Sequence, residues 1–125
     1  MFKTILLPID LSAKASWSKA LPAALELAKG EACSLHVLTV VPDFGLSVVG
    51  TFFDENFEKQ ALKKVGEDLT EWVNANVPDG VDVHPHVTHG RVYEQIMNAA
   101  DKLGADAIVM GSHTPELTDY LLGPN

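Results

Sequence analysis

Hydrophobic residues in this chain gather in four short apolar runs, separated by longer stretches with helical spacing. The runs cover Thr4–Ile9, Ser34–Val41, Val81–Val87 and Ala107–Met110. The first two are continuous, which is typical of strands buried on both faces of a parallel sheet. The third alternates apolar with polar residues and contains Pro85, which cannot donate to a ladder. We therefore expect it to be a half-buried edge strand.

The stretches between the runs place apolar residues at every third and fourth position, which predicts amphipathic helices. Pro22 should kink or delay the first helix, because it removes one backbone donor. Gly104 should end the last helix. The helices are expected near residues 17–28, 54–76 and 92–103, and the segment 43–53 has no clear period and is interpreted as a long connection.

Strands that alternate with helices imply right-handed crossovers and one parallel sheet. The fold class predicted is therefore α/β, an open parallel sheet with helices on both faces. A chain of 125 residues is long enough for one domain with its own core. We expect residues 1–125 to form a single domain.

Charge and composition exclude several classes of function. The formal net charge of -8 argues against a nucleic-acid or anionic-membrane surface. No apolar stretch approaches the ~20 residues that span a bilayer. Cys33 is the single cysteine, so an internal disulfide is impossible and a reducing compartment is the default. These features predict a cytoplasmic protein.

Ligands of an open α/β sheet bind beyond the carboxyl ends of its strands, so residues that follow the strands are the candidates for chemistry. Asp10 and His113 could form a triad with Ser12 or Ser112, but no nucleophile-elbow pattern surrounds either serine. No Walker A lysine motif and no G-x-G-x-x-G follow the first run. Asp10 or Ser12 could instead simply cap the first helix.

The histidines raise the question of a metal site. His84 and His86 should share one face of the third strand, with His89 nearby. No neighbouring cysteine or carboxylate completes a ligand set in the sequence, so metal binding is disfavoured. His36 is interpreted as a packed histidine of the second strand.

Several motifs together resemble one family. Pro8-Ile9-Asp10-Leu11-Ser12 resembles the P-x-D-x-S opening of the universal stress protein family. Leu35-His36-Val37 resembles the second strand of that family, and His89-Gly90-Arg91 resembles the turn into its third helix. The segment from Gly104 to His113 is similar to the most recognisable part of the family pattern. The resemblance covers the whole chain.

The resemblance implies a strand order of 3-2-1-4-5, so that Asp10 and Gly111 face one cleft between strands one and four. In nucleotide-binding members the matching aspartate lies at the adenosine end, and a backbone position matching Val37 contacts adenine. The loop after strand four surrounds the ribose and phosphates. The implied cofactor is ATP, with or without Mg²⁺, and the implied site residues are Pro8, Asp10, Ser12, Val37, Gly111, Ser112, His113, Gly123 and Asn125.

The phosphate loop departs from the family pattern G-x-x-G, nine residues, G-S/T. Thr114 replaces the second glycine, and the spacing from Thr114 to Gly123 is one residue short. Pro124 follows Gly123 and supplies neither a hydroxyl nor an N–H. Each departure removes a phosphate donor or the room for one.

The end of the chain also differs from the family. Members continue with a further helix and a fifth strand, which often pairs with its copy in a dimer. We expect this chain to lack both elements, and to form a homodimer if the last strand is present. The chain therefore looks C-terminally incomplete relative to the family.

Three functions follow from these features. The first is an ATP-binding stress-response regulatory protein, whose hydrolysis, if any, is slow because no residue stands out as a base. The second is a dimeric interaction module of the same fold without a nucleotide, which the altered loop favours. The third is a small hydrolase using Ser112 or Ser12, which lacks any base–nucleophile spacing.

Overall fold

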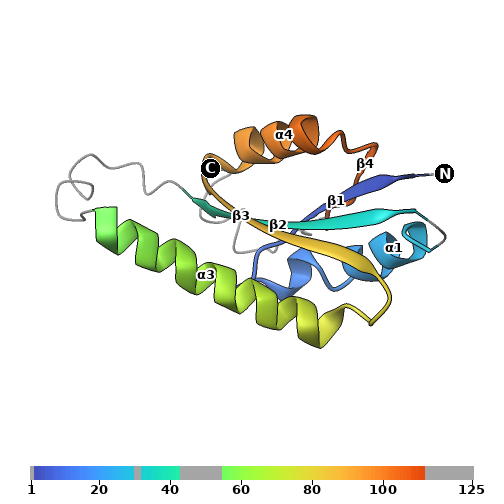
Figure 1. Cartoon of the computed structure of the whole chain (residues 1–125), viewed down its shortest axis with the longest axis horizontal. Coiled ribbons are helices and arrows are strands. Elements are labelled where there is room, and N and C mark those ends of the chain that lie inside the picture. The colour runs from blue at the N-terminus through green and yellow to red at the C-terminus, as the bar shows by residue number, and fades with distance from the viewer. Residues whose placement is uncertain (1, 30–31, 43–54, 112–125) are drawn as a thin grey trace, which may run out of the picture.

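A computed structural model describes residues 2–29, 32–42 and 55–111, with side chains from residue 58 onward in the last segment. Figure 1 shows the elements in chain order. They are β1 (Thr4–Pro8), a short 3-10 helix η1 (Lys14–Ser16), α1 (Ala20–Leu27), β2 (Ser34–Pro42), α3 (Glu55–Asn76), β3 (Asp82–Gly90), α4 (Val92–Leu103) and β4 (Ala107–Ile108). The expected connection at residues 43–53 lies outside the described residues.

The strands form one parallel sheet in the order β3-β2-β1-β4, as the family resemblance implied. The edge position predicted for the strand with Pro85 is confirmed. Pro85 pairs in register with Val37, and β3 is the outermost strand on that side. Pro8 is the last residue of β1, a position where the missing backbone N–H of proline is tolerated.

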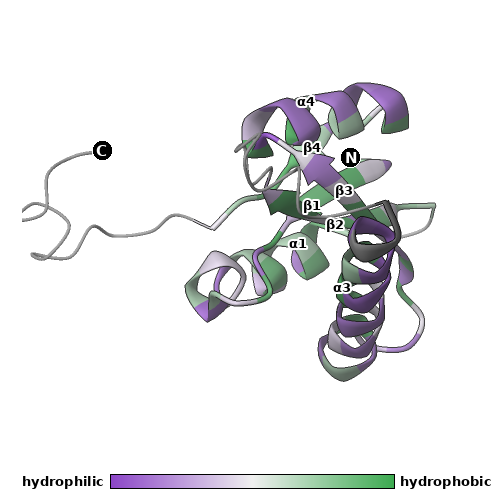
Figure 2. Ribbon diagram, turned by 90° about the vertical axis from the view of Figure 1, so that its left-hand side faces the viewer, coloured by the Kyte–Doolittle hydropathy of each residue, from purple (hydrophilic) through white to green (hydrophobic). Residues whose placement is uncertain are grey.

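Helices cover both faces of the sheet, α1 and α3 on one and α4 on the other (Figure 2). The larger core lies under α1 and α3, because residues at alternate positions of β1 and β2 point that way. Its buried members include Ile5, Leu7, Leu35, Val37, Leu69 and Trp72. The smaller core lies under α4 and contains Leu6, Leu38 and Ile96. No helix in the described part of the chain is long and apolar enough to cross a membrane.

Some boundaries differ from those expected. The first helix is divided into η1 and α1, and Pro22 is the third residue of α1. Pro22 therefore delays the helix and lies in its first turn, where N–H groups have no intrahelical acceptor. Gly104 ends α4 in the left-handed conformation, with φ of 65°, as predicted.

The last strand is shorter than the predicted Ala107–Met110, since β4 comprises Ala107 and Ile108. Val109 still donates its N–H to the carbonyl of Leu6 at 2.9 Å. Asp106, just before β4, holds the start of β1 through its carboxylate. Its two oxygens accept the N–H groups of Lys3 and Thr4 at 2.9 and 3.0 Å. These bonds fix how β4 is aligned with β1.

Candidate functional site

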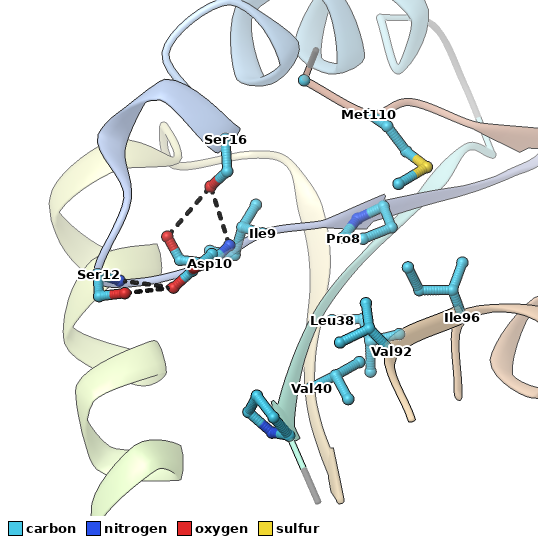
Figure 3. A pocket seen from close by; sticks show the side chains of 12 residues that line it. Pro8, Ile9, Asp10, Ser12, Ser16, Leu38, Val40, Val92, Ile96 and Met110 are labelled. Atoms are coloured by element: carbon cyan, nitrogen blue, oxygen red, sulfur yellow. Dashed lines mark hydrogen bonds between the residues drawn. The ribbon is translucent and has the colours of Figure 1, made fainter. Parts of the chain in front are cut away.

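A cavity of about 360 Å³ opens beyond the carboxyl ends of β1 and β2, between the sheet and the start of α4 (Figure 3). β1 and β4 are neighbours here, although the chain passes from β1 outward through β2 to β3 before it returns to β4 on the other side of β1. This is the topological switch point, where open α/β sheets bind ligands. Its lining residues are Pro8, Ile9, Asp10, Ser12, Ser16, Leu38, Val40, Pro42, Val92, Ile96, Met110 and Gly111.

The polar end of the cavity is the turn that follows β1. Ser12 donates to Oδ1 of Asp10 twice, from its N–H at 2.9 Å and from its hydroxyl at 2.6 Å. The carbonyl of Asp10 accepts the N–H of Ala13 at 3.0 Å, which closes the turn. In the described residues both side-chain bonds to Asp10 use Oδ1. Oδ2 therefore stays available for a hydroxyl or N–H donor of a ligand.

Neither Asp10 nor Ser12 caps a helix, although the sequence allowed either of them to cap the first helix. The N-cap of η1 is Ala13 and that of α1 is Lys19, and neither makes a side-chain cap bond. The reason is that Asp10 lies too early in the chain and bonds within its own turn.

Ser16 connects this turn to η1. Its hydroxyl oxygen accepts the N–H of Asp10 at 2.9 Å and lies 2.7 Å from the carbonyl oxygen of Ala13, to which it donates. The backbone of Ser16 also packs against Gly111, where a Cβ would lie 2.8 Å from the Ser16 carbonyl carbon. Ser16 thus holds the segment after β1 close to the segment after β4.

The opposite wall of the cavity is apolar. Leu38 and Val40 project from β2, Val92 and Ile96 from α4, and Met110 from the segment after β4 (Figure 3). Ile96 and Leu38 are buried, whereas Val92 and Met110 are 44% and 51% exposed. A flat aromatic or heterocyclic ring would bury the exposed apolar surface, with its polar substituent toward Asp10.

The structure brings together four of the residues that the sequence placed in the site, namely Pro8, Asp10, Ser12 and Gly111. Val37 lies elsewhere: its side chain is fully buried in the core under α1 and α3. The predicted contact of Val37 concerned its backbone, and it stays a prediction. Ser112, His113, Gly123 and Asn125 lie outside the described residues.

The rule that ligands bind beyond the strand ends pointed to residues 37–42, but sequence reasoning missed Ser16 and the wall residues Val92, Ile96 and Met110. Side chains alternate along a strand, so Val37 in the large core placed Leu38 and Val40 on the other face. That signal was available in the sequence. No local pattern marks Ser16, since its partners Asp10 and Gly111 are brought together by the fold.

His84 and His86 share one face of β3, as predicted, and His36 of β2 is packed against both of them. The Nδ1 of His36 lies 2.8 Å from the Nε2 of His86. The carboxylate missing from the sequence argument is Asp82, whose Oδ1 lies 2.9 Å from the Nε2 of His84. Within the described ranges, no group of three or more histidine, cysteine or acidic residues is arranged to hold a metal ion.

Comparison with known proteins gives consistent matches. The model of the universal stress protein family matches residues 1–125. Universal stress protein G of Escherichia coli O157:H7 is 31% identical over 127 residues, covering 100% of this chain and 89% of that protein. Universal stress protein A homolog 1 of Coxiella burnetii is 29% identical over 126 residues, covering 98% and 84%.

Solved structures share the fold. Hypothetical protein MJ0577 superimposes with a TM-score of 0.72 at 29% identity, over 92% of this chain and 78% of that chain. Universal stress protein UspA from Lactobacillus plantarum has a TM-score of 0.63 at 20% identity, over 96% and 90%. The second likeness is one of fold alone.

Proposed function

The chain belongs to the universal stress protein family, and on that premise we propose that this stress-response protein binds an adenine nucleotide in the cavity at the β1/β4 switch point. One observation carries the proposal. The residues of the P-x-D-x-S motif and Gly111, about a hundred positions apart in the sequence, line the same cavity. Its volume of about 360 Å³ falls in the range of small-ligand sites, roughly 300–1,000 Å³.

The two walls of the cavity suit the two parts of a nucleoside. The apolar residues Leu38, Val92 and Met110 provide contact area for a base. Oδ2 of Asp10, free of the turn bonds, is an acceptor for a ribose hydroxyl. Binding would therefore be oriented, with the base on the α4 side and the sugar toward the turn after β1.

The phosphates would then extend past Gly111. Ser112, His113, Gly123 and Asn125 are proposed to surround the ribose and phosphates, and Val37 to contact adenine through its backbone. ATP is the proposed nucleotide, with Mg²⁺ bound by its phosphates. The proposed role is regulatory, because Asp10 is the single ionisable side chain among the described lining residues, with Oδ1 bonded to Ser12 and Oδ2 assigned to the ribose hydroxyl.

Isothermal titration of the purified chain with ATP, AMP, adenosine and GTP, with and without Mg²⁺, tests the proposal. Adenine ligands should bind and GTP should bind less well. Asp10→Asn should weaken adenosine binding about tenfold or more, because it removes a charge-assisted hydrogen bond. Asp101→Asn, an exposed carboxylate on α4, is the matched control and should leave the affinity unchanged. Absence of heat and of thermal stabilisation with every adenine ligand would refute the proposal.

A second candidate is a dimeric interaction module without a nucleotide. It is supported by apolar side chains that remain exposed on and beside α4, where Tyr93 is 80% and Met97 is 57% exposed. Sedimentation velocity over a range of concentrations tests it. A homodimer that forms without nucleotide and is disrupted by Met97→Lys, together with no adenine binding, would favour this candidate over the first.

A further inference from the structure

Three histidines lie together on the α4 face of the sheet, where the edge strand β3 pairs with β2. His36 belongs to β2 and is the register partner of His84, whereas His86 lies opposite Leu38. Period-two alternation places all three side chains on the same face. β3 runs beside β2 at the edge of the sheet (Figure 1), so the cluster spans the junction that attaches the edge strand to the rest of the sheet.

The three imidazoles are in direct contact. The His36 ring stacks on the rings of His84 and His86, with centroids 4.8 and 5.1 Å apart. The Nδ1 of His36 and the Nε2 of His86 form a hydrogen bond of 2.8 Å. This bond crosses from β2 to β3 and adds to the backbone ladder between them.

The surroundings of the pair contain one compensating charge among the described residues. The carboxylate of Asp82 contacts the Nε2 of His84 at 2.9 Å, and its other oxygen accepts the hydroxyl of Ser34 at 3.1 Å. The neighbour of His36 on β1 is Leu6, and α4 presents apolar residues to this face: Ile96, Ala99, Ala100 and Leu103. Asp82 thus contacts His84 directly, whereas His36 and His86 contact each other.

A proton count shows why this pair is sensitive to acid. In the neutral state one of the two facing nitrogens carries a hydrogen and donates to the lone pair of the other. One further proton can enter at an outer nitrogen without disturbing this bond. A second makes both facing nitrogens N–H donors, so the hydrogen bond is lost and two imidazolium charges oppose each other.

We propose that the His36–His86 pair is an acid-sensitive contact that strengthens the attachment of β3 to β2 at neutral pH and weakens it when both imidazoles are protonated. The contact lies close to the cavity, because the register partner of His86 is Leu38, a lining residue. Acidification would therefore loosen the edge strand beside the cavity wall. This inference does not depend on nucleotide binding.

The environment of the pair favours the neutral forms. Burial lowers the pKa of His36, and the imidazoles of His86 and His84 lower it further, while Asp82 opposes them. Burial also lowers the pKa of His86, with a smaller contribution from His84. In the unfolded chain both imidazoles titrate near about 6.5 and bind protons that the folded chain excludes. The contribution of this pair to the free energy of unfolding is thus full above about pH 6.5. It is lost as pH falls below that value toward the lowered pKa values of the folded state.

Urea unfolding between about pH 7.5 and pH 5 tests the contact in the wild type, His36→Gln, His86→Gln and the double variant. The wild-type folding constant should fall by up to about tenfold per pH unit for each proton excluded. Each single variant should flatten this profile, and the double variant should flatten it no further. His89→Gln is the control, since His89 lies on the opposite face, 3.2 Å from Glu58. The change in the free energy of unfolding caused by His89→Gln should add to the change caused by His36→Gln or His86→Gln.

Histidine ring NMR of the wild type gives a second readout that needs no variant to fold. His36 and His86 should titrate in two separated steps, and amide exchange in β3, corrected for pH, should accelerate in the second step. Two independent titrations near about 6.5 would overturn the proposal. Additive effects of the two single variants on the pH profile would overturn it as well.

Discussion

Gly111, after β4, lies against the backbone carbonyl of Ser16, before α1, so closely that a Cβ at position 111 would overlap the Ser16 oxygen. The glycine is therefore required by the packing of two protein segments, whatever else binds there. Gly111→Ala must push these segments apart, because the obstructing atoms are backbone. We expect destabilisation by about 1–3 kcal/mol, measured by urea unfolding.

Gly66 provides the opposite case for the same substitution. It lies within α3, and a Cβ there would meet nothing within 4 Å. Gly66→Ala should stabilise the chain by roughly 0.8–1.0 kcal/mol, because alanine is the better helix former. If Gly111→Ala were as benign as Gly66→Ala, the close packing against Ser16 would be wrong.

Ser16→Ala removes the acceptor for the Asp10 N–H and the donor to the Ala13 carbonyl. The turn that presents Asp10 should loosen, so adenosine should bind several-fold less tightly if the proposed site is correct. The loss of stability should be about 1 kcal/mol. Calorimetric titration and urea unfolding measure the two effects. Ser18→Ala, at an exposed position two residues along, is the control and should change neither.

Asp106→Asn should lower the melting temperature at neutral pH, because an amide offers one acceptor where the carboxylate offers two to Lys3 and Thr4. Those backbone N–H groups, first Lys3 and then Thr4, lower the pKa of Asp106. The folded chain then releases this proton more readily than the unfolded chain. The stabilisation is present above about pH 4 and is lost as pH falls through the lowered value.

The protonation of Asp106 also provides a test of its role in stability. Thermal unfolding followed from about pH 6 to pH 2.5 should show a smaller acid-dependent loss in Asp106→Asn than in the wild type. Asp79→Asn, in the exposed turn before β3, should retain the wild-type pH profile. Superimposable profiles for Asp106→Asn and the wild type would contradict the assigned role.

Trp72 and Trp17 meet edge to face under the sheet, with ring centroids 5.4 Å apart and planes at 81°. Trp72 is only 8% exposed, so Trp72→Ala should cost about 3–5 kcal/mol in urea unfolding. Within the described residues the indole Nε1 of Trp72 has no hydrogen-bond partner. Trp72→Phe should therefore cost much less, since it keeps an aromatic ring and removes an unpaired buried donor. Equal losses for the two variants would show that ring packing contributes little.

Much of the fold could be predicted from the sequence because it depends on local patterns. The strand formed by the apolar run Thr4–Ile9, the edge character given by Pro85 and the helix end at Gly104 each follow from the chemistry of a few neighbouring residues. The order of the strands in the sheet did not follow from local patterns. It came from the resemblance to the family. The length of β4 differed because local hydrophobicity does not determine how far a strand pairs.

Tertiary structure alone decided which distant residues meet. The sequence identified Asp10 and Gly111 as candidates, but the role of Ser16 appeared only once the crossovers brought the ends of β1 and β4 together. His36 and His86 are 50 positions apart, and only the register of β2 with β3 makes them partners. The physical reason is that hydrophobic periodicity fixes the face of each element locally, whereas hydrogen bonds and close packing between elements depend on register and on the path of the chain.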